Sequence, residues 1–174
     1  VSYFYNRINE IIKDKEKHHI RPEVNPGMDF PFVQNDSDDA GWVKVNLPHD
    51  WAANGPFFEG ENPEVGGGMG RLPIQGVAWY RKKLNILPSD SAKSIFLDFE
   101  GVMSYAMVWV NGSLAGGWPY GYNSWRIDIT PYVHFGSENQ IAVRVDNPNN
   151  SSRWYPGAGI YRNVWLIKTN PIHI

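Results

Sequence analysis

The chain has 174 residues and a formal net charge of −2 at pH 7, from 16 Lys and Arg against 18 Asp and Glu. This small charge, with no long block of one sign, argues against a nucleic-acid platform and an electrostatic membrane binder. No apolar run reaches the ~18 residues of a membrane span. Cysteine is absent, which excludes disulfides and thiolate chemistry. Eight Trp, nine Tyr and eight Phe beside 17 Gly and 13 Pro are typical of a β-rich domain with many loops.

The beginning of the chain carries the helical pattern. Ile8, Ile11 and Ile12 recur at i, i+3 and i+4 among charged residues, which predicts a short amphipathic helix within residues 1–20. Two adjacent histidines follow at positions 18 and 19. Neighbouring residues on a helix do not share a face, so we interpret this pair as a solvated helix end rather than a metal site.

From Gly41 onward, apolar stretches alternate with turn residues. The predicted strands cover 42–45, 77–86, 95–101, 105–110, 114–118, 125–129, 140–146 and 163–168. Asn111-Gly112 between two apolar runs is a strong hairpin signal, and Thr130-Pro131 resembles an N-cap followed by the first position of one helical turn. Short strands with no helices between them indicate an all-β antiparallel sandwich or jelly roll. We therefore predict an N-terminal helical extension over residues 1–25 and a jelly roll over residues 26–174.

A long loop, roughly residues 52–75, separates the first predicted strand from the second. It contains several glycines, but neither Lys-Ser/Thr nor a helix follows them, so a phosphate-binding loop is not indicated. Loops of this length in a compact domain are usually functional or disordered. The sequence therefore makes this loop a candidate wall of a binding site.

Candidate catalytic groups are scattered. The carboxylate pairs Asp38-Asp39 and Asp98/Glu100 are interpreted as charges at turns and strand ends, and no G-x-S-x-G motif occurs. His49 and Asp50 are interpreted as groups that hold a turn by hydrogen bonds to the backbone.

Two aromatic loops, 116–122 and 152–162, carry more information. Flat rings beside Asp, Asn and Arg suit a sugar, which presents apolar C–H faces and hydroxyl edges. The same rings also suit the end of a sandwich core, and composition leaves both readings open.

Five motifs in order then bear a resemblance to a known family. They are Leu-Pro-His-Asp-Trp (47–51), Gly-Val-Ala-Trp-Tyr-Arg-Lys (76–82), Phe-Glu-Gly-Val (99–102), Val-Trp-Val-Asn-Gly (108–112) and Gly-Ala-Gly-Ile-Tyr-Arg-Asn-Val-Trp-Leu (157–166). Together they resemble the N-terminal sugar-binding domain of the family 2 glycoside hydrolases, and most closely bacterial β-galactosidases, over about residues 28–170.

The resemblance implies a jelly-roll first domain, followed in the parent chain by an immunoglobulin-like domain and a (β/α)₈ barrel. In such enzymes the barrel carries the two catalytic glutamates of a retaining double displacement. We therefore expect no catalytic residue, cofactor or metal in these 174 residues, which we take as an inactive piece of a longer chain. The implied partners are a β-galactoside-like carbohydrate and the downstream domains, with neither nucleic acid nor membrane. A bacterial periplasmic or secreted location is favoured.

The resemblance also suggests which residues approach the sugar. These are Asp50, Asn62, Arg153, Trp154 and Tyr155. In the register where β-galactosidases and β-glucuronidases have an acidic sugar contact, this chain has Arg153. Either a small gap restores an acid from Asp146, or Arg153 and Trp154 read the sugar instead. Arg162 is expected to anchor the loop rather than touch substrate.

Two further functions stay open at this point. The second hypothesis is a free-standing carbohydrate-binding module of similar jelly-roll build, with Trp118, Tyr120 and Trp154 as its platform. A purely structural domain, whose aromatic residues serve only to bury surface, is the third reading.

Overall fold

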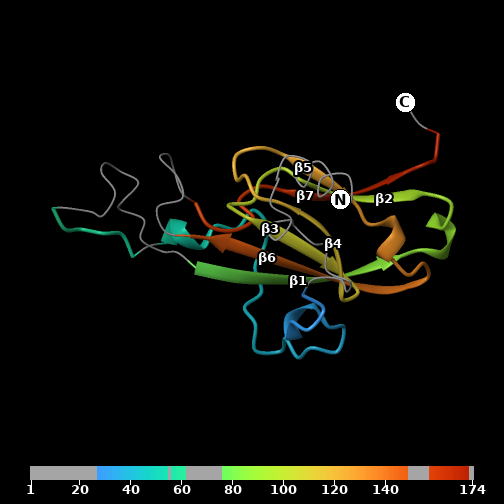
Figure 1. Cartoon of the computed structure of the whole chain (residues 1–174), viewed down its shortest axis with the longest axis horizontal. Coiled ribbons are helices and arrows are strands. Elements are labelled where there is room, and N and C mark those ends of the chain that lie inside the picture. Colours follow the sequence, from blue (N-terminus) through green and yellow to red (C-terminus); the bar gives the residue numbers. More distant parts are fainter. Residues whose placement is uncertain (1–26, 55, 62–75, 149–156, 173–174) are drawn as a thin grey trace, which may run out of the picture.

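The computed structural model describes residues 27–54, 56–61, 76–148 and 157–172. Within these, seven strands form two antiparallel sheets packed face to face (Figure 1). The strands are β1 (Gly76–Ile86), β2 (Ser94–Phe99), β3 (Ala106–Val110), β4 (Ser113–Trp118), β5 (Trp125–Asp128), β6 (Ser137–Asn147) and β7 (Val164–Thr169). The short 3₁₀ helices are η2 (Pro31–Val33), η3 (Trp51–Asn54), η5 (Pro88–Asp90) and η6 (Thr130–Tyr132). The predicted all-β jelly-roll sandwich is confirmed, and the predicted helix within residues 1–20 lies outside the described residues.

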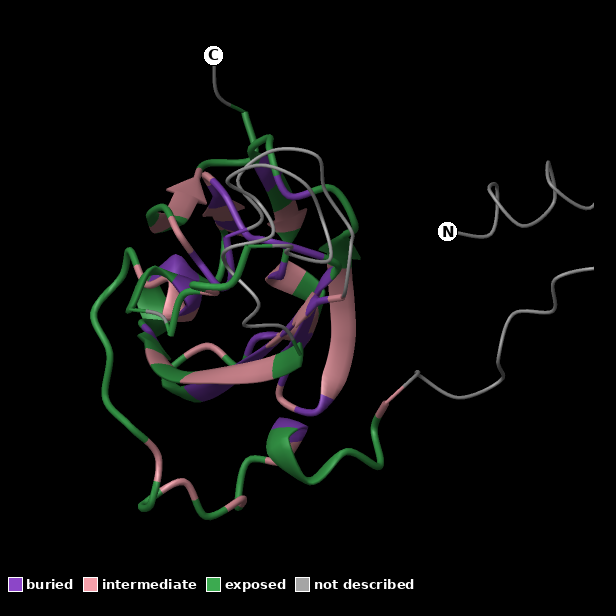
Figure 2. Ribbon diagram, turned by 90° about the vertical axis from the view of Figure 1, so that its left-hand side faces the viewer, coloured by how far each residue is buried: buried purple, intermediate pink, exposed green. Residues whose placement is uncertain are grey.

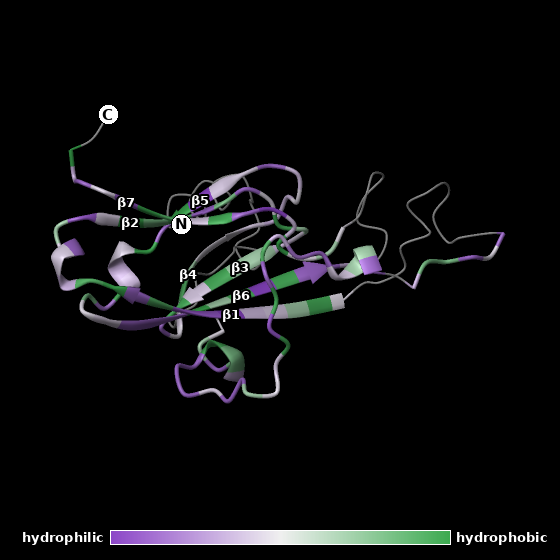
Figure 3. Ribbon diagram, turned by 180° about the vertical axis from the view of Figure 1, so that it is seen from behind, coloured by the Kyte–Doolittle hydropathy of each residue, from purple (hydrophilic) through white to green (hydrophobic). Residues whose placement is uncertain are grey.

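The larger sheet has the strand order β1-β6-β3-β4 and the smaller one β5-β2-β7. Successive residues of a strand point to opposite faces, so each strand places one set of its side chains between the two sheets. Figure 3 shows the two sheets as separate layers with hydrophobic residues on their strands. Ile95, Leu97 and Phe99 of β2 are buried in this way, and Phe99 stacks on Trp125 with the ring centroids 4.3 Å apart. The apolar core thus lies between the two sheets.

The β3–β4 hairpin matches its sequence signal. Asn111 has φ +49° and Gly112 has φ +80°, the left-handed pair of a two-residue type I′ turn. The Asn111 side chain also connects neighbouring loops. Its amide nitrogen donates to the carbonyl of Tyr132 (2.9 Å) and to Oδ1 of Asn139 (2.7 Å), and its own Oδ1 accepts the N–H of Gln140 (3.0 Å).

Residues 27–42, called here the strap, cover the outer face of the larger sheet. Val33 of the strap and Trp109 of β3 are both fully buried between strap and sheet. Phe30 packs edge-on against Trp79 and Trp109, with centroid distances of 5.7 and 6.0 Å. Figure 2 shows η2, the helical turn of the strap, with its buried end towards the sheet. The molecule therefore has a second, smaller apolar cluster outside the sandwich.

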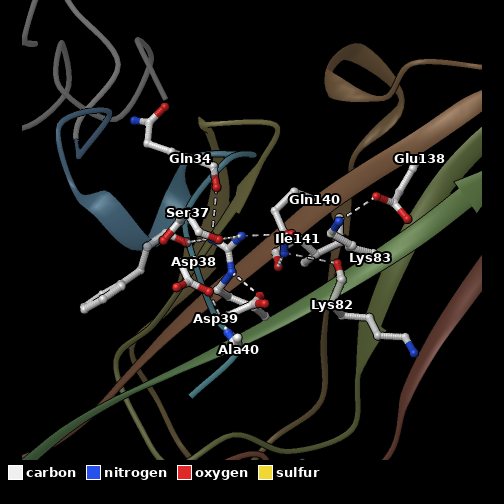
Figure 4. Close-up of polar contacts among 12 residues, drawn as sticks. Gln34, Ser37, Asp38, Asp39, Ala40, Lys82, Lys83, Glu138, Gln140 and Ile141 are labelled. Carbon is white, nitrogen blue, oxygen red and sulfur yellow. Dashed lines mark hydrogen bonds and ion pairs between the residues drawn. The ribbon is translucent and has the colours of Figure 1, made fainter. Parts of the chain in front are cut away.

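A single arginine of β1, Arg81, holds the strap in place. Figure 4 shows three of the residues that accept its hydrogen bonds, Ser37, Asp39 and Gln140. The side chain of Arg81 is 2% exposed, and its Nε donates to Oδ2 of Asp39 at 2.8 Å. The two terminal nitrogens donate to the carbonyls of Phe32, Gln34 and Ser37 and to the side-chain oxygen of Gln140. A guanidinium has five N–H donors, and these five bonds match that number. Burying this charge is tolerated because every donor is satisfied.

Two local predictions were wrong. Residues 42–45 form no strand, and Val43 is 85% exposed. A turn in which the N–H of Trp42 donates to the carbonyl of Asp39 (3.0 Å) fixes the start of this segment near Arg81. A cleft of about 840 Å³ separates it from β1, and an apolar cavity of about 350 Å³ lies between it and the core. An alternating pattern alone therefore does not create a strand, since this segment stays separated from the neighbouring edge strand β1.

Thr130 is the second case. The predicted helical turn is present as η6, but Thr130 is its first residue rather than its N-cap and makes no capping bond. Its hydroxyl instead accepts the backbone N–H of Ile95 at 2.7 Å and donates to Oδ1 of Asp128 at 2.6 Å. The side chain thus supplies a partner that the backbone of β2 lacks where β5 ends.

No helix among the described residues is long and apolar enough to cross a membrane.

Asp90 ties the β1–β2 connection to β7. Its side chain is 4% exposed and lies 2.9 Å from Nζ of Lys93 and 2.5 Å from Nζ of Lys168. Hydrogen bonds from Lys168 and Lys93 lower the pKa of Asp90 from 3.8 to about 2. The ionised form is therefore the one that the fold stabilises.

This arrangement predicts a pH-dependent stability. Because the pKa is lower in the folded state, the contribution of Asp90 is fully present above about pH 4 and is lost as the pH falls toward about 2. Asp90→Asn should lower the urea midpoint at neutral pH, and the difference from the wild type should shrink toward pH 2. The matched control is Glu138→Gln, which removes an exposed pair with Lys83 and should leave the midpoint unchanged. An Asp90→Asn difference that does not vary with pH would contradict this account.

Candidate functional site

The candidate site lies at one end of the sandwich. At this end β1, β3, β5 and β7 begin and β2, β4 and β6 end, so the loops 100–105 and 119–124 meet here. In Figure 1 it is the end marked by the arrowhead of β6, the start of β1 and η3. The β3–β4 hairpin, η5 and η6 lie at the opposite end. The sequence motifs that contain Asp50 (47–51) and Gly159 (157–166) lie at the end where the candidate site is.

Two segments far apart in the sequence pair at this end. The N–H of His49 donates to the carbonyl of Ile160 (2.8 Å), and the N–H of Trp51 donates to the carbonyl of Ala158 (2.9 Å). Gly159, between those two acceptors, exchanges both backbone bonds with Met103, at 2.9 and 3.0 Å. Residues 48–51, 157–160 and the loop around 103 therefore form one small antiparallel arrangement, called here the paired segments.

Asp50 stands within the paired segments. Its Oδ1 accepts the N–H of Ala52 (2.9 Å), which closes a turn, and the N–H of Ala158 (2.9 Å), 108 residues away in the sequence. The interpretation of Asp50 as a residue that holds a turn is confirmed, and the carboxylate also holds the second segment. A carboxylate can accept several hydrogen bonds, so this role is compatible with a contact to a sugar hydroxyl.

His49 and Tyr80 form a second tie. Nδ1 of His49 lies 2.8 Å from the hydroxyl of Tyr80, which reaches the paired segments from β1 in the larger sheet. Burial raises the pKa of Tyr80 to about 12, partly offset by a hydrogen bond from the backbone of Ile160. Tyr80 is therefore a neutral phenol at every physiological pH.

Exposed aromatic rings lie beside the paired segments. Trp118 and Tyr120 are 42% and 58% exposed, and the N–H of Tyr105 donates to the carbonyl of Pro119 between them (3.1 Å). Nε1 of Trp118 donates to Oδ1 of Asn123 (2.9 Å). With its N–H satisfied internally, Trp118 offers its ring rather than its polar edge to a ligand.

The carboxylate pairs are engaged in structural contacts. Asp39 accepts a hydrogen bond from Nε of Arg81, and Asp98 accepts one from Nε of Arg126 at 3.0 Å. Glu100 accepts Nε1 of Trp165 at 2.8 Å and Nδ2 of Asn163 at 3.1 Å, and the Trp165 bond is the main cause that lowers the pKa of Glu100. The pattern agrees with the interpretation of these residues as charges at turns and strand ends.

Asp146, considered as a replacement acid for the sugar contact, is also engaged. Its Oδ2 lies 2.8 Å from a terminal nitrogen of Arg144. Both residues share the face of β6 that carries Ala142, a member of the outer cluster. The carboxylate thus lies on the outer face of the larger sheet.

The other predicted sugar contacts are Asn62, Arg153, Trp154 and Tyr155, and they lie outside the described residues. Arg162 is exposed, and its guanidinium lies 5.9 Å from the ring centroid of Tyr161. The Tyr161 hydroxyl donates to the carbonyl of Gly121 (2.6 Å). Among the described residues, no group of three or more His, Asp or Glu side chains comes together as a metal site.

Sequence reasoning missed Tyr80 and Gly159 as organisers of this end. Gly159 has φ +119°, and a Cβ built there would lie 2.5 Å from the Tyr80 hydroxyl and 2.6 Å from the carbonyl oxygen of His49. The Gly-Ala-Gly run and the tyrosine of Trp-Tyr-Arg were visible in the sequence. Their contact was not, because it joins residues 79 positions apart, as the numbering shows.

Comparison with known proteins agrees with this geometry. The family description "Glycosyl hydrolases family 2, sugar binding domain" matches residues 71–170. The β-galactosidase BoGH2A of Bacteroides ovatus is 49% identical over 144 residues, covering 82% of this chain and 16% of that protein. A β-glucuronidase of Formosa agariphila is 30% identical over 186 residues, covering 95% of this chain and 18% of that protein.

A solved structure gives the same result for the fold. The crystal structure of a β-glycosidase from Bacteroides vulgatus superposes with a TM-score of 0.71 at 39% identity, over 80% of this chain and 18% of that one. The chain therefore spans less than a fifth of the length of these relatives. By its sequence match and its sandwich, the chain belongs to glycosyl hydrolase family 2, where it corresponds to the sugar binding domain.

Proposed function

We propose that the chain is the N-terminal domain of a retaining glycoside hydrolase of the β-galactosidase type. In this proposal it forms one wall of the sugar pocket, and a barrel elsewhere in the parent protein supplies the catalytic acid/base and nucleophile. Its partners are then a β-galactoside-like carbohydrate and the other domains of the same chain. The observation that carries the proposal is the bond between Asp50 and Ala158, which joins the two motif segments at one end of the fold.

Several features of that end support a role in sugar binding. The paired segments place a carboxylate, Asp50, at the end of the fold where the Trp118 and Tyr120 rings are exposed. Carbohydrate recognition uses this combination, because hydroxyls need hydrogen-bond acceptors and the apolar C–H faces of the sugar pack on rings. Asn62, Arg153, Trp154 and Tyr155 remain proposed contacts on the strength of the motifs that flank them.

A β-galactoside is the favoured substrate class, since the protein with 49% identity is named a β-galactosidase. A β-glucuronide is the competing class, because two other relatives, which are 30% and 31% identical to this chain, are named β-glucuronidases. The proposed Arg153 contact bears on this choice, since a guanidinium suits the carboxylate of a uronate. Comparing nitrophenyl β-galactoside with nitrophenyl β-glucuronide as substrates of the parent protein decides between them.

Calorimetry of the 174-residue chain with galactose and lactose tests whether this domain binds sugar without the rest of the parent protein. We expect no detectable binding, because a single wall leaves most of the sugar in water. Hydrolysis of nitrophenyl β-galactoside should require the parent protein. Hydrolysis by the 174-residue chain itself would refute the assignment of catalysis to another domain.

A free-standing carbohydrate-binding module is the second candidate. The exposure of Trp118 and Tyr120 supports it, since such rings form a platform on which a sugar can stack. Trp154, the third ring proposed for that platform, adjoins the paired segments in the sequence. Binding of galactose to the isolated chain at millimolar concentration or tighter, lost in Trp118→Ala, would favour the module over the pocket wall.

A further inference from the structure

Tyr80 connects the two sheets at the candidate site. It belongs to β1 of the larger sheet and faces inward, together with Leu84 and Ile86 of the core. Its hydroxyl reaches the paired segments, the second of which leads along the chain into β7 of the smaller sheet. A side chain in this position can transmit the placement of β1 to both paired segments at once.

The Tyr80 hydroxyl interacts with both paired segments. It lies 2.8 Å from Nδ1 of His49, and the tautomer of the imidazole decides which of the two groups donates. On the other segment, the backbone of Ile160 partly offsets the rise that burial causes in the pKa of Tyr80.

Close packing reinforces these bonds. A Cβ placed on Gly159 would lie 2.5 Å from the Tyr80 hydroxyl, so the phenol rests directly against the backbone of the second segment. On the other side, His49 is joined to Asp50, whose Oδ1 holds Ala158. Tyr80, His49 and Asp50 therefore form a continuous series of contacts from β1 to the proposed sugar contact.

We propose that Tyr80 is a positioning residue for sugar binding. Its hydroxyl fixes the separation of residues 48–51 from residues 157–160 and so orients the Asp50 carboxylate in the pocket. This inference rests on the proposed function, because the contact that Tyr80 positions is the sugar contact proposed there. Tyr80 itself touches no substrate, and its effect passes through His49 and Ile160.

The test uses the full-length parent hydrolase with nitrophenyl β-galactoside and nitrophenyl β-glucuronide. For the better substrate, Tyr80→Phe should raise KM about five- to tenfold and change kcat less than about twofold, because one hydrogen bond that orients a binding group is lost. A purely structural defect would reduce the fraction of active enzyme, which lowers the apparent kcat and leaves KM unchanged. The ratio of the two effects therefore separates positioning from stability.

Two further variants complete the design. Tyr132→Phe removes a hydroxyl from a partly buried tyrosine at the opposite end of the fold and should leave both constants unchanged. His49→Leu removes the hydrogen-bond partner of the Tyr80 hydroxyl and should raise KM as Tyr80→Phe does. The double variant should be no worse than either single one, because the two residues act as a unit. If Tyr80→Phe melts below the assay temperature, His49→Leu carries the test.

The outcomes separate the two proposals. A wild-type parent protein that hydrolyses neither nitrophenyl glycoside overturns the proposed function. A wild type that is active, with Tyr80→Phe and His49→Leu both showing unchanged KM, overturns the positioning role alone. A KM increase of the same size in Tyr132→Phe would overturn it as well.

Discussion

Replacing Arg81 by methionine should lower the free energy of unfolding by about 3 kcal/mol, since each buried acceptor left without its donor costs about 1–3 kcal/mol. The Asp39 carboxylate, which is 41% exposed, is partly hydrated once the guanidinium is gone and adds little to this cost. Methionine fills much of the same space but leaves four backbone and side-chain acceptors and the Asp39 carboxylate without their donor. The strap should loosen with it. Urea unfolding followed by tryptophan fluorescence measures the effect, because Trp79 and Trp109 both pack against the strap.

Lys83→Met is the matched control for this prediction. Lys83 is also on β1, two residues on, but its ion pair with Glu138 is more than half exposed on both sides. Exposed pairs contribute about 0–1 kcal/mol, so this variant should unfold within about 0.5 kcal/mol of the wild type. Equal stability of Arg81→Met and Lys83→Met would show that the strap does not depend on the guanidinium.

Gly159→Ala should disrupt the paired segments and with them the proposed sugar pocket. At φ +119° an alanine is strained, and its Cβ would collide with the Tyr80 hydroxyl at 2.5 Å and the carbonyl oxygen of His49 at 2.6 Å. We expect a loss of about 3–5 kcal/mol in unfolding free energy, from backbone strain and overpacking together. In the proposed parent hydrolase, kcat/KM should fall about a hundredfold, as displacement of a binding group by about 1 Å can cause.

Gly76 supplies the control for backbone strain alone. Its φ of +120° is nearly identical to that of Gly159, but no heavy atom of the described residues lies within 4 Å of a Cβ built there. Gly76→Ala should therefore cost about 1–2 kcal/mol and change kcat/KM little. If both variants lose the same stability and activity, the close approach of Tyr80 and His49 to Gly159 does not contribute to either.

Local sequence signals predicted the strands of this fold well. Seven of the predicted strands appear within a few residues of their expected limits, because alternation and turn residues such as Asn111-Gly112 act over short distances. The segment at 42–45 alternates as well as the others, yet it forms no strand. What decides its conformation is the anchoring of Asp39 by Arg81, a contact between residues 42 positions apart.

The site was predictable only in part. The motif around Asp50 identified a residue of the paired segments, and the bond from Ala158 gives it a role across the fold. Tyr80 and Gly159 escaped prediction because their importance lies in mutual contact. A phenol next to a glycine with positive φ has no signature in either residue's own neighbourhood.

The hairpin at Asn111 also affects the rate at which this asparagine deamidates. In an unfolded chain, Asn-Gly is the dipeptide that most readily loses its side-chain amide, because the following backbone nitrogen attacks the side-chain carbonyl. Here that amide is held at both ends, by the acceptors Tyr132 and Asn139 and by the donor Gln140. The attack needs a rotation that these bonds prevent. Isoaspartate at position 111 should therefore accumulate in molecules that have spent time unfolded, so its amount reports how long the protein has been unfolded.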